Sequence, residues 1–325
     1  MAVVKSIRPS GTVSGRFTGS TRLIIGAVLI VALLVAPFVA YPGFLMKALC
    51  FALFACAFNL MLGFVGLLSF GHAAFFGTAA YASGYAAKVW GLTPELAILF
   101  GGLIGGLMGL VIGAIAIRRQ GIYFAMITLA ISQMVFFFAI QAGSITGGED
   151  GLQGVPRGRL FGLISLEDSL TMYYFVLAVF LIGFALIWRI VNSPYGAVLK
   201  AIRENEPRAI SLGYQVNRFK VMAFALSAAL TGVAGGTKAI AVQLASLTDV
   251  QWQMSGEVIL MTLLGGVGTL VGPAVGGALV VGLENYLATS GLPVTMVIGV
   301  VFVVCVLVFR RGIVGEINVF LGRRR

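Results

Sequence analysis

The chain has 325 residues, of which 59% are hydrophobic and only 10% are charged, and its mean hydropathy is +1.04. These proportions exclude a soluble domain as the main body of the chain. The net charge of +11 does not indicate nucleic-acid binding, because the basic residues stand at the ends of apolar segments and form no patch with interleaved aromatic residues. The composition therefore predicts an all-α, polytopic membrane protein.

About ten apolar segments follow one another, each near the length of about 20 residues that a helix needs to cross a bilayer core. The predicted spans are 22–41, 44–62, 70–90, 95–117, 121–141, 170–190, 219–242, 254–267, 270–289 and 292–309. The third, eighth and ninth are rich in glycine, serine and threonine, so their limits are soft. Segments of this kind often hold broken or re-entrant helices, which are tolerated where they face protein or a water-filled cavity.

The basic residues predict the orientation of these spans, because cytoplasmic flanks carry an excess of Lys and Arg. If the spans are counted from a cytoplasmic N-terminus, most of the Lys and Arg residues fall on the cytoplasmic side. This asymmetry predicts an even number of spans, with both termini in the cytoplasm. The predicted organisation is a cytoplasmic tail at 1–21, a transmembrane domain at 22–312 and a basic cytoplasmic tail at 313–325. Within the domain, the loop at 142–168 is expected outside the cell membrane and the loop at 193–218 inside.

Two ridges of glycine predict close packing between helices. In lipid, glycine repeated every four residues lets two helix axes approach closely. The first ridge consists of Gly101, Gly105, Gly109 and Gly113, and the second of Gly268, Gly272 and Gly276. This pattern indicates helix contacts and says little about function.

The longest strongly polar run, from Asn192 to Lys220, also has helical periodicity. Small and apolar residues recur there at steps of three and four, which predicts a helix with an apolar stripe around 201–213. Because membrane proteins seldom keep a helix in a loop without a partner, the run is interpreted as a docking element. The alternative is a solvated cytoplasmic loop that only follows the charge rule.

Polar side chains at membrane depth are costly unless they are paired or face water, so they are candidates for a translocation path. The candidates in or near the predicted spans are Asn59, Ser69, His72, Thr128, Ser132, Gln133, Gln243, Glu257, Thr262, Glu284 and Asn285. Glu257 and Glu284 are the acidic members of this set. For each of them, a place on a pathway and an interhelical hydrogen bond or boundary position both remain open.

No residue pattern predicts an enzyme. His72 follows Ser69 by three residues, but no third group is placed to orient it, so no catalytic residue is assigned. Cys50, Cys56 and Cys305 lie inside apolar spans and lack the spacing of metal ligands. They are interpreted as packing residues, and neither a metal nor a cofactor is predicted.

Several linked motifs carry a family resemblance. They are GLLSFGHAAFFG at 66–77, GIYFAMITLA at 121–130, TGGEDGL at 146–152, AIRENE at 201–206, and SGE at 255–257 with LGGVGTLVGP at 264–273. Over roughly 40–312 the chain resembles the LivM-type permeases of branched-chain amino-acid ABC importers. Several motifs in one order are more specific than any of them alone.

The resemblance implies a permease subunit of an importer in the bacterial inner membrane, with ATP hydrolysis on separate subunits. The sequence has no G-x-x-x-x-G-K-[ST] phosphate loop, as expected for such a subunit. Family members pair with a second related permease, dock two ATP-binding subunits and receive substrate from a periplasmic binding protein. The loop at 193–218 would then be the coupling segment, and the loop at 142–168 would be periplasmic.

Two other functions remain open. A urea or short-amide ABC permease is a near alternative, because such permeases share much of the motif set. An ion-coupled secondary transporter is a different class that would work without partner subunits. The docking loop and the expected absence of buried charge pairs argue against it.

The candidate residues form three groups. For coupling to the ATPase they are Ala201, Arg203, Glu204, Glu206, Ala209 and Gly213; for the translocation path Asn59, Thr128 and Gln133; and for the binding protein Glu149, Asp150 and Arg157. Ala209 and Gly213 match the importer pattern Glu-Ala-Ala-x-x-x-Gly, whereas Pro207 stands where its Glu would be. The path candidates carry an amide or a hydroxyl group and no charge, because a path with few fixed charges is expected to let an amino acid pass without trapping it.

Overall fold

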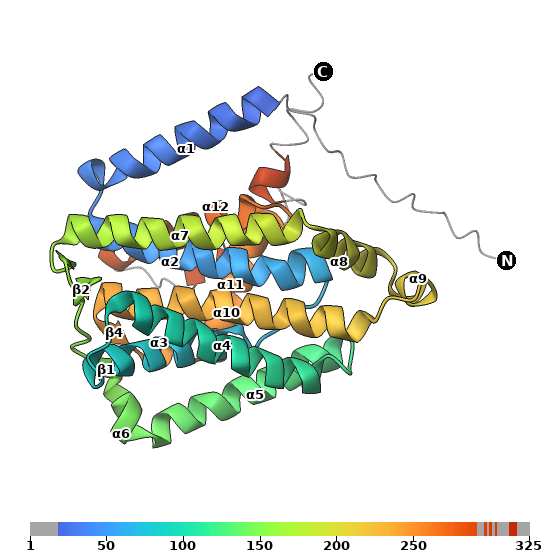
Figure 1. Ribbon diagram of the computed structural model, residues 1–325, viewed down its shortest axis with the longest axis horizontal. Coiled ribbons are helices and arrows are strands. Elements are labelled where there is room, and N and C mark those ends of the chain that lie inside the picture. Colours follow the sequence, from blue (N-terminus) through green and yellow to red (C-terminus); the bar gives the residue numbers. More distant parts are fainter. Residues whose placement is uncertain (1–18, 291–295, 298, 301–302, 304–311, 317–325) are drawn as a thin grey trace.

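The computed structural model describes residues 19–290, 296–297, 299–300, 303 and 312–316, and its secondary structure is almost entirely helical (Figure 1). The helices are α1 (Gly19–Val39), α2 (Pro42–Asn59), α3 (His72–Lys88), α4 (Pro94–Ala116), α5 (Ile122–Gln141), α6 (Gly143–Thr146), α7 (Ser169–Val191), α8 (Pro194–Glu204), α9 (Glu206–Ser211), α10 (Val216–Val242), α11 (Trp252–Gly265) and α12 (Gly272–Ser290). A π-helical turn, η1 (Leu60–Val65), continues α2, and η2 (Gly148–Asp150) and η3 (Leu247–Asp249) are short 3₁₀ turns.

Among the described residues, five helices are long and apolar enough to cross a membrane: α2 together with η1, α4, α5, α7 and α10. The described chain is thus an all-α, multi-pass membrane protein. The first nine predicted spans, from 22–41 to 270–289, coincide with helices whose ends differ from the prediction by a few residues. The predicted span at 292–309 and both tails lie largely outside the described residues.

Of the three segments with soft limits, the third and the eighth fold as the shorter helices α3 and α11, of 17 and 14 residues, and the ninth folds as α12, of 19 residues. Non-helical stretches interrupt the bundle beside them, at 66–71 between η1 and α3 and at 266–271 between α11 and α12. We call these stretches the first break and the second break. The first break separates η1 from α3, and the second break separates α11 from α12.

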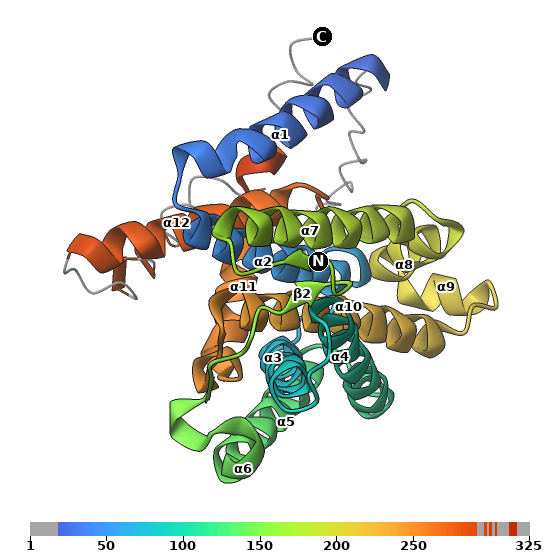
Figure 2. The same cartoon turned by 60° about the vertical axis from the view of Figure 1, so that its left-hand side comes forward.

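The centre of the bundle is α2, whose residues from Ala48 to Asn59 are all buried. Helix α2 packs against α7, α10 and α12, and α10 packs in turn on α3 and α4. Helix α1 stands apart (Figure 2) and contacts the bundle at α7 and α2. The Tyr173 hydroxyl of α7 donates a hydrogen bond of 2.6 Å to the Leu33 carbonyl of α1.

The long helices give the molecule two distinct ends (Figure 1). One end holds α8 and α9. The other holds short strands that fasten the 142–168 loop: β1 (Leu152–Gln153) pairs antiparallel with β4 (Leu244–Ala245), and β2 (Arg159–Leu160) pairs with β3 (Ile164–Ser165). The two loops predicted on opposite sides of the membrane therefore lie at opposite ends of the bundle.

The first glycine ridge forms the contact between α4 and α10. A Cβ on Gly105 would lie 2.8 Å from the Ala228 carbonyl oxygen, and a Cβ on Gly109 would collide with the Ala228 side chain. Backbone therefore touches backbone along this seam, as the four-residue spacing predicts.

The second ridge is not one helical face. Gly268 lies in the second break with φ +78°, whereas Gly272 and Gly276 sit on α12 against Gly265 and Met261 of α11. The two helical glycines let α11 and α12 form a tight hairpin. The positive φ of Gly268 supplies the turn that precedes α12.

Replacing Gly109 by Leu should destabilise the α4–α10 seam by about 1–3 kcal/mol or more, because overpacking forces the backbones apart. The control Ala114→Leu adds comparable bulk on the same helix at an exposed position. Thermal unfolding of the purified protein in detergent measures both. Equal unfolding temperatures for Gly109→Leu and Ala114→Leu would contradict a close seam.

Candidate functional site

The polar run folds as two helices, so the single helix predicted around 201–213 is wrong. Helix α8 ends at Glu204, and Asn205 is extended with φ −157°. The Asn205 side chain accepts a hydrogen bond of 3.1 Å from the Arg208 amide and caps the start of α9, where Pro207 occupies the first turn. Asn at the cap and Pro in the first turn are typical helix-start residues, and they break the run here.

Only part of the predicted apolar stripe of this segment packs on the protein itself. Ile202, Ala209 and Val216 form a small buried cluster beneath α8 and α9. Gly213 has φ +86°, and no atom lies within 4 Å of the place a Cβ would occupy. Ala209 therefore anchors α9, and Gly213 shapes the turn that follows it.

Glu206 is tied to the start of α10. Its carboxylate lies 2.7 Å from Lys220 Nζ and accepts a hydrogen bond of 3.0 Å from Gln120 Nε2. The Tyr195 hydroxyl donates a hydrogen bond of 2.8 Å to the Phe219 carbonyl, and burial raises the pKa of this tyrosine. These contacts hold α8 and α9 against the bundle as one unit.

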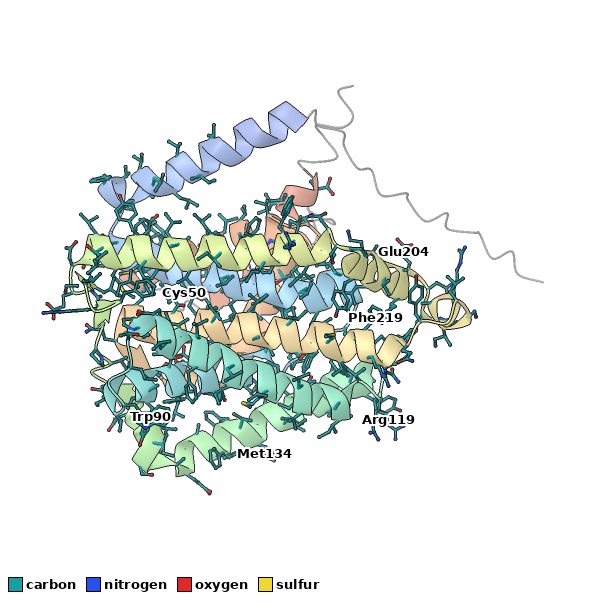
Figure 3. All side chains as sticks on the ribbon, in the orientation of Figure 1. Cys50, Trp90, Arg119, Met134, Glu204 and Phe219 are labelled. Carbon is teal, nitrogen blue, oxygen red and sulfur yellow. The ribbon has the colours of Figure 1, made fainter. Side chains whose placement is uncertain are left out.

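The outer surface of this unit combines charged and apolar side chains. Ala201, Arg203 and Glu204 are exposed, and Figure 3 shows Glu204 at this end of the bundle, far from Trp90. Three apolar side chains project beside them, with exposed fractions of 57% for Ile210, 69% for Leu212 and 42% for Tyr214. We call Ile210, Leu212 and Tyr214 the tip cluster. Leu212 and Tyr214 were not among the residues predicted for docking, because the sequence does not show which apolar side chains of the segment are exposed.

Arg203 links α8 to both breaks. Its guanidinium donates a hydrogen bond to the Gly63 carbonyl on η1, just before the first break. Its Nη1 lies 3.0 Å from the place that a Cβ on Gly268 would occupy in the second break. Its Cγ stands similarly close to Gly66. One side chain of the polar segment thus contacts both places where the helices are interrupted.

The three predicted path residues do not come together. Asn59 is buried and braces the second break, where it accepts from the Gly268 amide at 3.0 Å and donates to the Thr269 carbonyl at 2.8 Å. Thr128 is buried and accepts from the Phe70 amide at 3.1 Å in the first break. Gln133 is half-buried and makes no hydrogen bond with any described residue. The path role of the three stays a prediction.

The predicted binding-protein residues lie in the strand-bearing loop. Glu149 and Asp150 are exposed in η2. Both terminal nitrogens of Arg157 donate to backbone carbonyls, at 3.1 Å to Glu167 and 3.0 Å to Ala241. Arg157 therefore fastens the loop to the end of α10, which reduces its freedom to pair with another protein.

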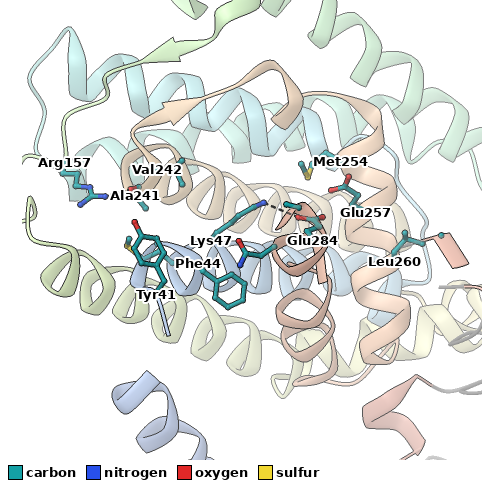
Figure 4. A pocket seen from close by; sticks show the side chains of 15 residues that line it. Tyr41, Phe44, Lys47, Arg157, Ala241, Val242, Met254, Glu257, Leu260 and Glu284 are labelled. Carbon is teal, nitrogen blue, oxygen red and sulfur yellow. Dashed lines mark hydrogen bonds and ion pairs between the residues drawn. The ribbon is translucent and has the colours of Figure 1, made fainter. Parts of the chain in front are cut away.

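A cavity of about 960 Å³ lies between α2, α10, α11 and α12, toward the strand-bearing end (Figure 4). Lys47, Glu257 and Glu284 line it together with Arg157, and the Lys47 ammonium lies 3.3 Å from the Glu284 carboxylate. Asn59, Thr128 and Gln133 are absent from its walls. Lys47 was not among the site residues predicted from the sequence.

The expectation that the bundle holds no buried charge pair is wrong. Lys238 of α10 lies 2.7 Å from Asp249 of η3, and both side chains are almost completely buried. The Asp249 carboxylate also accepts two hydrogen bonds of 3.1 Å from Ser246. Additional hydrogen bonds of this kind are what make a buried pair tolerable.

Ser69 and His72 share no hydrogen bond. The His72 ring lies 2.9 Å from the Ser227 hydroxyl, and Ser69 accepts from the Gly71 amide. Among the described residues, no three His, Cys, Asp or Glu side chains gather in a way that could hold a metal.

A family model described as "Branched-chain amino acid transport system / permease component" matches residues 40–309. The chain belongs to this family. It is 28% identical over 233 residues to the high-affinity branched-chain amino acid transport system permease protein LivM of Salmonella typhimurium and, equally, to that of Escherichia coli. The matched region covers 65% of this chain and 55% of each relative, so it spans about half of their length.

A probable LivM of Methanocaldococcus jannaschii is 28% identical over 190 residues, which are 54% of this chain and 51% of that protein. A probable LivH of the same organism is 24% identical over 216 residues, which are 62% of this chain and 65% of that protein. No solved structure matches the chain.

Replacing Asn59 by Ala should destabilise the protein by about 1–3 kcal/mol for each backbone group left unsatisfied in the second break. The matched control Gln133→Ala removes an amide that bonds to no described residue, and it should stay within about 0.5 kcal/mol of the wild type. Thermal unfolding in detergent compares the two. If Asn59→Ala unfolds at the wild-type temperature, Asn59 does not brace the break.

Proposed function

We propose that the chain is the permease subunit of an ATP-driven ABC importer for branched-chain or related hydrophobic amino acids. The observation that carries this proposal is the family match over residues 40–309. In this role the chain spans the bacterial inner membrane with both termini in the cytoplasm. It acts with a second related permease, two ATP-binding subunits and a periplasmic binding protein, and it holds no cofactor or metal of its own.

The α8–α9 end is the proposed docking surface for an ATP-binding subunit. An exposed apolar cluster rimmed by charged residues is typical of an interaction site, and the tip cluster has this character beside Glu204 and Arg208. Helices seated in a groove use apolar side chains in this way. Ala209 and Gly213 support the surface from within by anchoring and turning α9.

Arg203 is the proposed link between docking and transport. ATP-driven movement of the docked subunits would displace α8, and Arg203 would carry that displacement to η1 and the second break. Rigid helices joined through short irregular stretches are suited to such hinge or rocking motion. The buried cluster beneath α8 and α9 makes the segment move as one body.

The alternatives have distinct physical requirements. An ion-coupled secondary transporter needs no docking surface, and the buried Lys238–Asp249 pair is the observation that would favour it. Family membership over most of the chain weighs against it. A urea permease moves an uncharged ligand, whereas the large cavity carries fixed charges of both signs.

Replacing Leu212 by Glu should impair docking without unfolding the chain, because the side chain is 69% exposed. Losing a contact worth about 1 kcal/mol would weaken ATPase association by about fivefold. The measurements are co-purification of the ATP-binding subunits and uptake of labelled leucine by the assembled transporter in proteoliposomes.

The matched control is Leu163→Glu, the same substitution at the opposite end, where Leu163 is highly exposed. This variant should retain wild-type co-purification. Wild-type uptake after Leu212→Glu would remove the docking role. Wild-type transport of urea in place of leucine, or leucine uptake without ATP-binding subunits, would overturn the proposed function itself.

The proposed orientation predicts that single cysteines at Ser165 and Ser211 label from opposite sides of the membrane. Both residues are exposed, at the two ends of the bundle. In a background without Cys50, Cys56 and Cys305, a membrane-impermeant maleimide should modify Ser165→Cys in intact cells and Ser211→Cys only after lysis. Labelling of both in intact cells would contradict the topology.

A further inference from the structure

The large cavity brings ionisable groups of both signs together from three helices. Lys47 comes from α2, Glu257 from α11 and Glu284 from α12, and their charged ends face the same space (Figure 4). Lys47 and Glu284 are 237 positions apart in sequence and form an ion pair of 3.3 Å. The Lys47 ammonium also lies 5.6 Å from the centre of the Phe51 ring.

Glu257 is the unpaired member of this group. Its carboxylate makes no hydrogen bond or ion pair with any described residue, although it faces the cavity beside the Lys47–Glu284 pair. An ionised group in such a place is costly unless water or a counter-charge satisfies it. The fourth charged group of the wall, Arg157, donates through both terminal nitrogens to backbone carbonyls, so Glu257 is the carboxylate that remains to complement a ligand ammonium group.

The remaining wall is mainly apolar. Phe44, Val242, Met254 and Leu260 line the same space. Ligand sites typically enclose about 300–1,000 Å³ and combine an apolar lining with a few placed polar groups. A cavity of about 960 Å³ therefore has room for an amino acid and the waters that accompany it.

We propose that this cavity binds the transported amino acid as a zwitterion. The ligand carboxylate takes the place of Glu284 on Lys47, and the ligand ammonium lies between Glu257 and the released Glu284. This exchange adds no net charge, and it gives Glu257 the counter-charge that it otherwise lacks, because the ligand ammonium is shared between Glu257 and the released Glu284. The inference rests on the proposed function and assigns residues to its substrate site.

An uncharged ligand cannot make this exchange. Urea carries neither a carboxylate nor an ammonium group, so the Lys47–Glu284 pair would stay closed in its presence. The same three residues thus separate the two substrate classes that the sequence leaves open.

The test uses the complete transporter in proteoliposomes with its binding protein and labelled leucine. Lys47→Met and Glu257→Gln should each lower leucine uptake at least tenfold. ATP hydrolysis stimulated by the loaded binding protein should stay within twofold of the wild type, because both side chains lie far from the α8–α9 end. The control Lys88→Met removes an exposed lysine near the same end but outside the cavity, and it should keep uptake within twofold.

A double variant distinguishes ligand binding by Lys47 from a role of Lys47 in balancing the charge of Glu284. If Lys47 only balances Glu284, then Lys47→Met with Glu284→Gln removes both charges of the pair and should restore uptake. If Lys47 binds the ligand carboxylate, the double variant should remain at least tenfold impaired. Restored uptake would overturn the proposal.

Direct occupancy is measured with Met254→Cys in the background without native cysteines. Leucine should slow the reaction of this cysteine with a charged methanethiosulfonate, and urea at the same concentration should not. Equal protection by both ligands, or by neither, would overturn the proposed site. A wild-type transporter without leucine uptake would instead overturn the proposed function, whereas normal leucine uptake by Lys47→Met and Glu257→Gln would overturn only the site.

Discussion

The need to satisfy backbone polar groups where helices are interrupted shapes this molecule more than any other constraint. In a bilayer the cost of an unpaired amide or carbonyl is several kcal/mol, so non-helical backbone survives only when protein groups bond to it. Asn59 serves the second break through its two amide contacts. Ser255 serves the first, accepting from the Ala73 amide at 2.9 Å and donating to the Phe70 carbonyl at 2.8 Å. These two polar side chains at membrane depth thus form hydrogen bonds with backbone groups at or beside the breaks.

Small residues make this arrangement possible. Bonds between a side chain and a distant break require the helices to approach closely, and the glycines of α4 and of the α11–α12 hairpin permit that approach. Side chains with a Cβ on these faces would separate the helices and lengthen the bonds that hold the breaks. Close helix packing and the hydrogen bonding of the backbone at the breaks therefore depend on each other.

The sequence predicted the helices well because lipid imposes a simple rule: each span needs a long apolar run, and the polar loops mark where it ends. It failed at Asn205, where the helical period continued through a break that the cap and Pro207 impose locally. The helix-start residues Asn205 and Pro207 were visible in the sequence, but the prediction relied on the helical period. The second glycine ridge was extended to Gly268 for the same reason, because the four-residue spacing continues past the end of the helix.

The candidate sites were harder, because a polar residue in a span does not reveal what its side chain faces. Asn59 and Thr128 carry the chemistry expected of a path, yet each bonds to a break. For Glu257 and Glu284 a place on a pathway and an interhelical or boundary position were both open, and both side chains face the cavity. Their partner Lys47 lies in another part of the chain. Pairing over such separations depends on tertiary packing, which neither spacing nor composition contains.

The α11–α12 hairpin reaches from the contacts of Arg203 to the cavity. Glu257 stands in the first half of α11 and Glu284 in the second half of α12, so both acids lie away from the closed end of the hairpin, beside the cavity. Its closed end is the second break, where Asn59 and Arg203 contact the backbone. In the proposed coupling, a shift of α8 that moves Arg203 would act on the closed end. Gly272 and Gly276 let the two helices pack closely. The hairpin would therefore move as one rigid body, and the distance between its two acids and Lys47 would change with that movement.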